Sequence, residues 1–266
     1  MPKRSETIRR AAGATLVVVL ASASVHASAA QLAPLPIAPA SAHAMPNVQA
    51  IGALYGWMSG ISGSASVRDL SASIDVRFVD LLKHLRFAAM GTFEAGYGPW
   101  LLVSDDMYSS VRVGRTASRL PNQPDLDFTS KMFIGQAFAG YAWMTSQTVA
   151  VDILVGGRLW ATSSTLNISG DSASRERSTN PSWGDALGGI RVRWAAAPKW
   201  LLSAEGDGGG GGSKGTGEGM ATAQYDLSHH WSLFASYRYL QENYEKNDFS
   251  LDVHLDGPLI GGAYRW

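Results

Sequence analysis

From residue 51 to the C-terminus, apolar and polar residues alternate along most of the chain. Between residues 183 and 194, apolar or small residues occupy one set of alternate positions, and Asp185, Arg191 and Arg193 occupy the other. The same period of two recurs at 85–95 and 231–242. Because successive side chains of a β-strand point to opposite faces, the pattern predicts strands with one apolar side and one polar side.

Ten segments carry this pattern, and the connections between them alternate in length. The segments are residues 51–65, 85–95, 99–113, 127–143, 148–162, 182–197, 199–207, 218–228, 230–245 and 249–266. The tight connections are 96–98, 145–147, 198 and 228–229, and the long or polar ones are 66–84, 114–126, 163–181 and 208–217, followed by a short one at 246–248. Short periplasmic turns and longer outer loops are typical of outer-membrane barrels. The sequence therefore predicts an all-β fold: a closed antiparallel transmembrane β-barrel of about ten strands, or of eight if the weaker segments 199–207 and 218–228 do not count.

Tryptophans gather at the strand ends beside the tight turns. They are Trp100, Trp143, Trp194, Trp200, Trp231 and Trp266. Outer-membrane barrels carry such aromatic girdles at the membrane interface. A soluble β-sandwich is the alternative, but it would spread its tryptophans through a core. Its strands are also usually 5–6 residues long, whereas most segments here have 11–18 residues.

Residues 1–29 have the three parts of a secretory signal peptide: a basic start, an uncharged apolar stretch and small residues at the cleavage site. A membrane anchor is the alternative, but the apolar stretch is too short for a hydrocarbon core about 30 Å thick. Residues 30–50 are rich in proline and alanine and are expected to form a disordered lead-in. The barrel then comprises residues 51–266, exported through a cleaved signal peptide to the outer membrane.

The composition excludes several classes of function. The chain has 22 Lys and Arg against 22 Asp and Glu, and removal of the signal peptide leaves 18 against 21. A nucleic-acid binder would carry a basic excess, so no nucleic-acid partner is expected. Because the chain has no cysteine, disulfide scaffolds, thiolate zinc sites and a cysteine nucleophile are also excluded.

The last strand ends in a terminal aromatic residue, Trp266, with Tyr264 two positions before it. This ending resembles the C-terminal signal that the barrel assembly machinery of the outer membrane recognises. The resemblance implies that Tyr264 and Trp266 serve as an assembly signal and that the assembly machinery is a partner.

Residues 51–266 as a whole resemble a family of uncharacterised Gram-negative outer-membrane β-barrel proteins, related loosely to the OmpA- and OmpW-type barrels. The stretches that carry the resemblance are residues 73–94, 100–108, 156–160 (GGRLW), 206–209 (GDGG), 236–239 (SYRY) and 257–261 (GPLIG). The glycine run 208–212 departs from the family pattern, in which a larger residue stands between glycines. The resemblance implies a monomeric barrel in contact with outer-membrane lipid and lipopolysaccharide, and it implies no activity.

Projection of the strands places charged residues on the lumen face. They are Arg86, Glu94, Asp152, Arg158, Asp185, Arg191, Arg193, Glu205, Asp207, Arg238 and Glu242. Long Arg side chains that pair with carboxylates would span much of a ten-stranded lumen. We therefore expect a salt-bridged structural interior, and the alternative is a narrow channel whose charges select small solutes.

The segment 79–85 breaks the alternation, because Val79, Leu82 and Lys83 fall at helical spacing with Asp80 near the start. It predicts a short helix in the first long connection. This helix is either a plug at the barrel mouth or an ordinary turn of the loop.

An enzyme is the alternative function. Outer-membrane proteases of the omptin type are also ten-stranded and use a carboxylate pair with an Asp–His pair, a spacing that Asp125 and Asp127 and then Asp252 and His254 resemble. Such two-residue patterns arise often on polar strand faces, so we expect no catalytic residues. The adjacent acids Asp105 and Asp106 would point to opposite faces of their strand.

Neither a metal nor a cofactor is expected. The neighbouring His229 and His230 would be splayed apart by a strand. The glycine run 208–212 lacks the Lys-Ser/Thr ending of a phosphate-binding loop and is expected to be a flexible outer loop. Surface adhesion through the connections 66–84 and 163–181 is a third possibility, although neither carries a recognisable binding motif.

Overall fold

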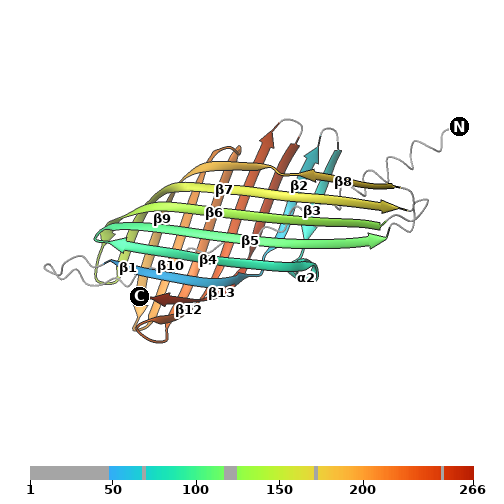
Figure 1. Ribbon diagram of the computed structural model, residues 1–266. Coiled ribbons are helices and arrows are strands. Elements are labelled where there is room, and N and C mark those ends of the chain that lie inside the picture. Colours follow the sequence, from blue (N-terminus) through green and yellow to red (C-terminus); the bar gives the residue numbers. More distant parts are fainter. Residues whose placement is uncertain (1–47, 68–69, 117–124, 171–172, 247–248) are drawn as a thin grey trace.

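The computed structural model describes residues 48–266, except for 68–69, 117–124, 171–172 and 247–248. Ten antiparallel strands form a ring in the order β1-β4-β5-β6-β7-β9-β10-β11-β12-β13, and β13 pairs with β1 to close it (Figure 1). Their bounds are Gln49–Trp57 (β1), Leu85–Tyr97 (β4), Trp100–Thr116 (β5), Asp125–Thr145 (β6), Val149–Gly170 (β7), Ser182–Ala197 (β9), Trp200–Gly211 (β10), Gly215–Asp226 (β11), Trp231–Lys246 (β12) and Phe249–Arg265 (β13). The prediction of a closed antiparallel barrel of ten strands is confirmed. The predicted signal peptide, 1–29, and nearly all of the lead-in lie outside the described residues.

Tight turns join the strand pairs at one end of the barrel. Tyr97 pairs with Trp100 across Gly98, and Ala197 pairs with Trp200 across Lys199. Each turn contains one residue in the left-handed region, with φ 58° at Gly98 and 72° at Lys199. Two-residue turns require such a conformation because the chain reverses within one peptide pair.

The first predicted strand, 51–65, is wrong in one respect: it is interrupted. β1 ends at Trp57, and a second strand, β2 (Gly60–Val67), continues along the same partner, β13. The chain then returns beside β2 as β3 (Leu70–Val76), where a loop was expected. A Cβ on Gly257 of β13 would lie 2.3 Å from the carbonyl oxygen of Met58. The glycine therefore permits the close approach at which the strand is offset.

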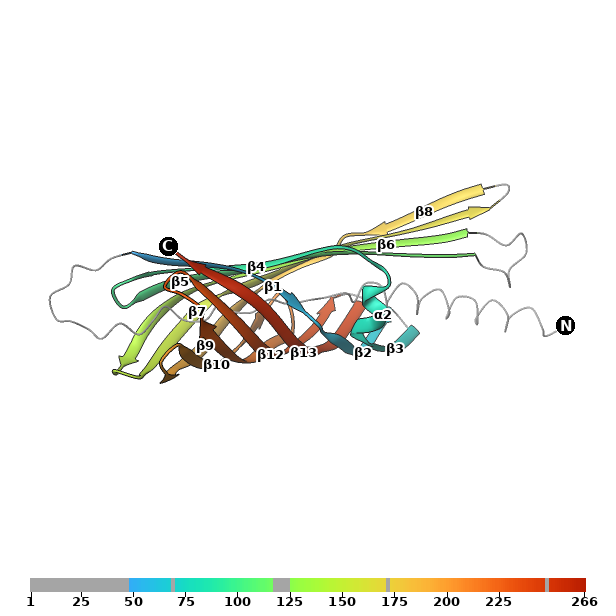
Figure 2. The same cartoon turned by 90° about the horizontal axis from the view of Figure 1, so that it is seen from below.

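The long connections 114–126 and 163–181 were expected to be loops, and much of them is strand. β5 extends to Thr116, β6 begins at Asp125, and β7 continues to Gly170. A further strand, β8 (Ala173–Thr179), pairs with the end of β7. These strands project well beyond the rest of the barrel (Figures 1 and 2). Backbone hydrogen bonds hold them, and Arg112 pairs with Asp127 across the ladder. A polar ladder of this kind needs no apolar face, so its sequence resembles that of a loop.

The expectation of a flexible glycine loop at 208–212 is also wrong. Residues 208–211 end strand β10 and pair with β9, and Gly208 and Gly209 also pair with β11. A Cβ on Gly209 would lie 1.8 Å from the carbonyl oxygen of Ala186 on β9. The missing side chains let the neighbouring backbones approach closely, which is the role of these glycines.

Gly156 of β7 allows a test of such close packing. A Cβ there would lie 2.0 Å from the carbonyl oxygen of Ala137 on β6, whereas a Cβ on Gly188 of β9 would meet nothing within 4 Å. We expect Gly156→Ala to reduce the free energy of unfolding by about 1–3 kcal/mol because backbone has to move. Gly188→Ala is the matched control and should leave the denaturant midpoint unchanged. Equal midpoints for the two variants would contradict the packing described.

The predicted helix is present as α2 (Phe78–Leu82), between β3 and β4 (Figure 2). Leu81 is its buried residue and belongs to the main apolar cluster, against which Val76 and Leu85 also pack. A hydrogen bond from Lys83 lowers the pKa of the exposed Asp80 carboxyl. Among the described residues, no helix is long and apolar enough to cross a membrane.

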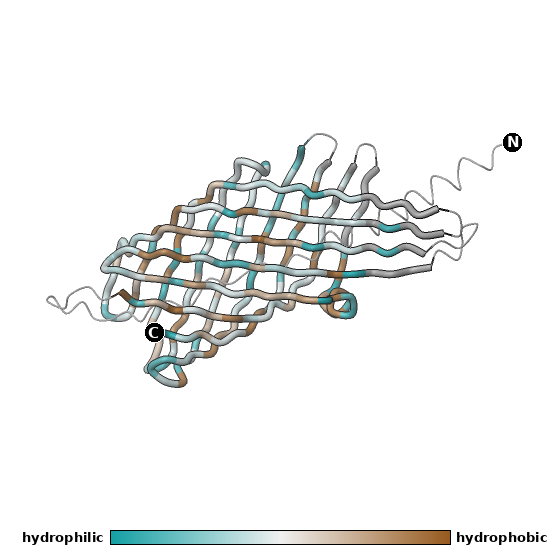
Figure 3. The backbone as a smooth tube through the Cα atoms, viewed as in Figure 1, coloured by the Kyte–Doolittle hydropathy of each residue, from teal (hydrophilic) through white to brown (hydrophobic). Residues whose placement is uncertain are grey.

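The outer face of the barrel is apolar over much of its height. Hydrophobic residues recur along the barrel strands (Figure 3), and many of them are exposed, including Leu54, Val155 and Ile190. The six tryptophans beside the tight turns are all exposed as well, by 46–67%. An apolar wall bounded by aromatic rings is the arrangement that lets a closed sheet cross lipid without unpaired backbone groups.

Candidate functional site: the charged interior

Charged side chains reach across the inside of the barrel. Arg191 of β9 contacts Glu94 of β4, and Arg158 of β7 contacts Glu218 of β11. These strands are not neighbours in the ring. Each pair therefore crosses the interior, and all four side chains are at most 2% exposed.

The first cluster lies towards the tight turns and centres on Arg191. Its guanidinium donates to Glu94 at 2.7 Å and to Asp152 of β7 at 3.1 Å. Arg193, two residues further on, donates to the other oxygen of Asp152 at 2.9 Å. Glu205 of β10 stands opposite Arg191 in the strand register and is half-buried. Two arginines and three carboxylates thus fill this level of the barrel.

The second cluster centres on Arg158, whose three guanidinium nitrogens all donate hydrogen bonds. It donates to Gln136 at 2.8 Å, to Thr216 at 2.8 Å, to Asp207 at 3.0 Å and to Glu218 at 2.7 Å. Its acceptors come from β6, β10 and β11. One buried arginine therefore joins four strands.

Arg238 of β12 extends the second cluster to the opposite wall. It pairs with Glu218 and lies 3.5 Å from Asp105 of β5, which also accepts a hydrogen bond from Tyr55 at 3.1 Å. Its guanidinium stands 5.5 Å from the ring of Trp57, within the range of a cation–π contact. Glu218 is thus shared by two arginines.

An aromatic stack lies inside the barrel, beyond these clusters in the direction away from the tight turns. Trp183 is 5.7 Å from Trp160 and 4.2 Å from Tyr244 between ring centroids, and its Nε1 donates to Glu242 at 2.8 Å. Asp185 accepts a hydrogen bond from the backbone nitrogen of Ser213 at 2.8 Å. Rings, rather than ion pairs, fill the interior at this level.

The residues predicted for the lumen face can now be placed. Ten of them are buried or half-buried: Glu94, Asp152, Arg158, Asp185, Arg191, Arg193, Glu205, Asp207, Arg238 and Glu242. Arg86 is the exception and requires a correction, because its side chain is exposed. It stands at a register shift between Leu85 and Phe87 on β4, and the extra residue of a bulge leaves the regular alternation.

Sequence reasoning missed several members of the clusters, chiefly Asp105, Gln136 and Glu218. A signal for Glu218 exists: in β11, the small residues 217, 219, 221 and 223 alternate with Thr216, Glu218 and larger residues. For Asp105, the parity of β5 sends it inward, where it is 1% exposed, and sends Asp106 outward. The prediction that these two acids face opposite ways is confirmed.

Acids outnumber bases among the buried charged residues. The buried carboxyl residues are Glu94, Asp105, Asp152, Asp185, Glu218 and Glu242, and the buried arginines are Arg158, Arg191, Arg193 and Arg238. Arginine is always protonated, so four positive charges lie among these six carboxyl groups.

Asp127 and His254, two residues of the protease alternative, do not come together in the described structure. Asp127 pairs with Arg112, and His254 bonds Tyr239 at 2.8 Å on the outer side of β13. β6, which carries Asp125 and Asp127, is separated in the ring from β13, which carries Asp252, by β5, β4 and β1. Among the described side chains, neither Asp127 nor His254 contacts a residue of the other pair.

The described part of the chain offers no metal centre: it contains no group of three or more His, Asp or Glu side chains placed to hold an ion. His229 and His230 stand in the turn between β11 and β12, where the His230 ring contacts the carbonyl oxygen of Arg265 at 2.9 Å.

Comparison with known proteins shows remote likeness only. No protein-family model and no curated protein sequence matches the chain. Among solved structures, the outer membrane protease OmpT from Escherichia coli is 9% identical over 83% of this chain and 97% of its own, with a TM-score of 0.46. The attachment invasion locus protein Ail of Yersinia pestis is 14% identical over 84% and 100%, with a TM-score of 0.32. The toluene transporter TodX of Pseudomonas putida is 9% identical over 85% and 91%, with a TM-score of 0.33.

Likeness at this level carries no argument about activity, so the conclusion rests on the geometry of the chain itself. A closed antiparallel ring with an apolar outer face, a polar interior and aromatic residues beside its tight turns meets the physical requirements for crossing lipid as strands. The protein is an outer-membrane β-barrel.

Proposed function

We propose that this barrel is not an enzyme and that its role is structural, with a lumen closed by the arginine–carboxylate clusters. The observation that carries the proposal is that the side chains of Arg158, Arg191 and Arg238 are 0% exposed while each bridges carboxylates from other strands. Eight-stranded barrels have filled interiors, and barrels of sixteen strands or more hold water. In a ten-stranded ring, crossing arginines supply the missing volume.

Planar-bilayer recording tests this proposal. We expect the purified protein to give no discrete conductance steps at any applied voltage, because buried arginine side chains cross the lumen between its walls. Arg238→Ala removes the side chain that joins Glu218 to Asp105 and is expected to give brief openings. Regular steps from the unaltered protein would contradict a closed lumen.

Passage of small cations is the second candidate, and the excess of six buried acids over four buried arginines favours it. If steps do appear, the reversal potential across a KCl gradient decides. A preference for K⁺ would support this candidate, and a preference for Cl⁻ would contradict it.

We further infer that Tyr264 and Trp266 act as the assembly signal and that the monomer contacts outer-membrane lipid and lipopolysaccharide directly. The backbone nitrogen of Trp266 donates to Ala50 at 3.1 Å, so the end of the chain lies beside the first strand. The Trp266 side chain is 67% exposed. A recognition signal needs to be both accessible and adjacent to the closing seam.

A further inference from the structure

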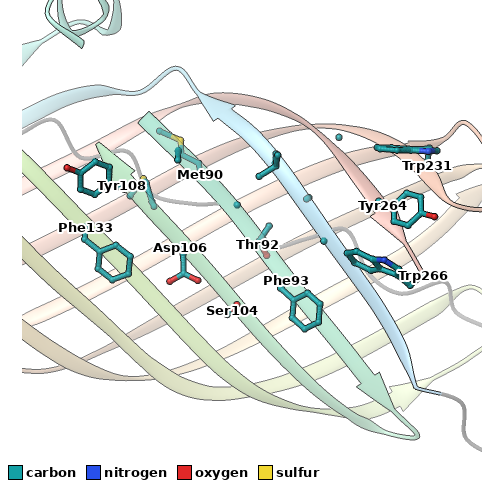
Figure 4. A pocket seen from close by; sticks show the side chains of 17 residues that line it. Met90, Thr92, Phe93, Ser104, Asp106, Tyr108, Phe133, Trp231, Tyr264 and Trp266 are labelled. Carbon is teal, nitrogen blue, oxygen red and sulfur yellow. The ribbon is translucent and has the colours of Figure 1, made fainter. Parts of the chain in front are cut away.

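The outer surface of the barrel carries a groove that the interior clusters do not involve. It runs over β1, β4 and β5 to the ends of β12 and β13 and encloses about 860 Å³ (Figure 4). Trp231, Tyr264 and Trp266 stand at one end, and Tyr108 and Phe133 stand at the other. Its volume lies within the range of small-molecule sites, about 300–1,000 Å³.

A carboxylate, Asp106, stands in this apolar groove. Its side chain is exposed and lies between Phe133 and Phe93 (Figure 4). In the strand register it is directly opposite Gly91 on one side and Gly135 on the other. A Cβ on Gly135 would lie 2.9 Å from the Asp106 Oδ1 atom. The absence of a side chain on Gly135 therefore makes room for the carboxylate, which lies over this glycine beside the Phe133 ring.

The position of Asp106 along its strand places it deep in the membrane. It is six residues beyond Trp100, which belongs to the ring of exposed tryptophans. With a rise of about 3.3 Å per residue and a tilt near 40°, it lies roughly 15 Å above that ring in a hydrocarbon band about 25 Å tall. An ionisable side chain at such depth is costly and is a functional-site candidate. Within the described residues, no side chain is recorded as a hydrogen-bond or ion-pair partner of Asp106.

We propose that the groove binds an amphiphilic amine, with the amino group on Asp106 and the apolar body against the aromatic rings. When ionised, the Asp106 carboxylate only accepts hydrogen bonds, so a ligand that stabilises this ionised form in the groove has to donate, and an ammonium donates most strongly. A plain acyl chain would leave the carboxylate without a donor. The small volume of the groove favours a single apolar chain over a helix.

Quenching of tryptophan fluorescence tests the proposal with the full chain in phosphatidylcholine nanodiscs. The probe is 10-bromodecylamine, and 10-bromodecanol is its uncharged match. Bromine quenches nearby indoles, and Trp231 and Trp266 line the groove. We expect half-maximal quenching at a concentration at least about tenfold lower for the amine than for the alcohol, as one charge-assisted hydrogen bond implies.

Asp106→Asn should remove the difference between amine and alcohol. Asp256→Asn is the matched control: Asp256 is another carboxylate on the outer face of β13, but it already accepts a hydrogen bond from Tyr237 at 2.5 Å. The control should retain the difference. Gly135→Ala keeps the carboxylate and narrows the space beside it, so it should weaken amine quenching even if the Asn variant assembles poorly. Equal quenching by amine and alcohol in the unaltered protein, or an unchanged preference in Asp106→Asn, would overturn the proposal.

Discussion

Replacement of Arg191 with alanine is expected to lower the free energy of unfolding by about 3–5 kcal/mol. The guanidinium is 0% exposed and donates to Glu94 and Asp152, which are themselves 0% exposed. Without it, Glu94 loses its ion-pair partner, and Asp152 keeps only Arg193. A carboxylate left buried without a partner costs far more than the pair contributes, which is why the expected loss is large.

Arg112→Ala is the matched control for this variant. Arg112 also pairs with an acid on a neighbouring strand, Asp127, but the two side chains are 48% and 29% exposed. An exposed pair contributes about 0–1 kcal/mol, so the loss should stay within that range. Urea titration of the folded fraction in lipid vesicles, followed by tryptophan fluorescence, measures both. Similar losses for the two variants would show that Glu94 and Asp152 are not desolvated in the barrel.

Replacement of Trp183 with alanine is the other change with a large expected effect, a loss of about 3–5 kcal/mol. The ring is stacked between Trp160 and Tyr244 and is 7% exposed. Its removal leaves a cavity in the interior and takes away the donor to Glu242. The midpoint of urea unfolding should fall accordingly.

Two further variants separate the causes. Trp183→Phe keeps a ring in the stack and removes only the hydrogen bond to Glu242, so we expect about 1–3 kcal/mol. Trp194→Ala, on the same strand, removes a ring that is 49% exposed on the lipid side, and its effect should be clearly smaller than that of Trp183→Ala. If Trp194→Ala cost as much as Trp183→Ala, burial would not be the cause.

The strand alternation was enough to predict the ring. Each of the ten predicted segments overlaps a barrel strand because lipid on one side and a polar interior on the other impose a strict period of two. The tight turns were equally readable, since Gly98 and the Pro198–Lys199 pair suit abrupt reversals.

The outer elements could not be read in this way. Strand β8 is polar on both faces, and β2 and β3 are short strands in which a serine-rich face alternates with a face of small and aliphatic residues. Backbone hydrogen bonds within the ladders hold all three, and in β8 such bonds leave no periodic trace in the sequence. The end of β10 was not predicted either, because its glycines pair with the neighbouring strands through backbone alone and show no alternation of apolar and polar side chains.

For the interior, parity along a strand predicts which residues point inward but not which ones meet. Arg191 and Glu94 are 97 residues apart and belong to strands that do not touch. Their contact follows from the circumference of the ring, which depends on the number of strands and their stagger. Arg86 shows the reverse case, in which one extra residue on β4 changes the side to which a side chain points.

The interruption between β1 and β2 has a mechanical consequence for the wall. β13 is paired along one side by β12 and along the other first by β1 and then by β2. The register between β1 and β4, in contrast, ends at Leu54 and Gly91. Among the described residues, β4 from Leu85 to Met90 is therefore paired only with β5, and α2 lies at its start. A strand segment that is hydrogen-bonded along one edge only separates from the ring more easily than one paired along both edges. Exchange of backbone amides with solvent will begin along this line, and the rest of the ring will open after it.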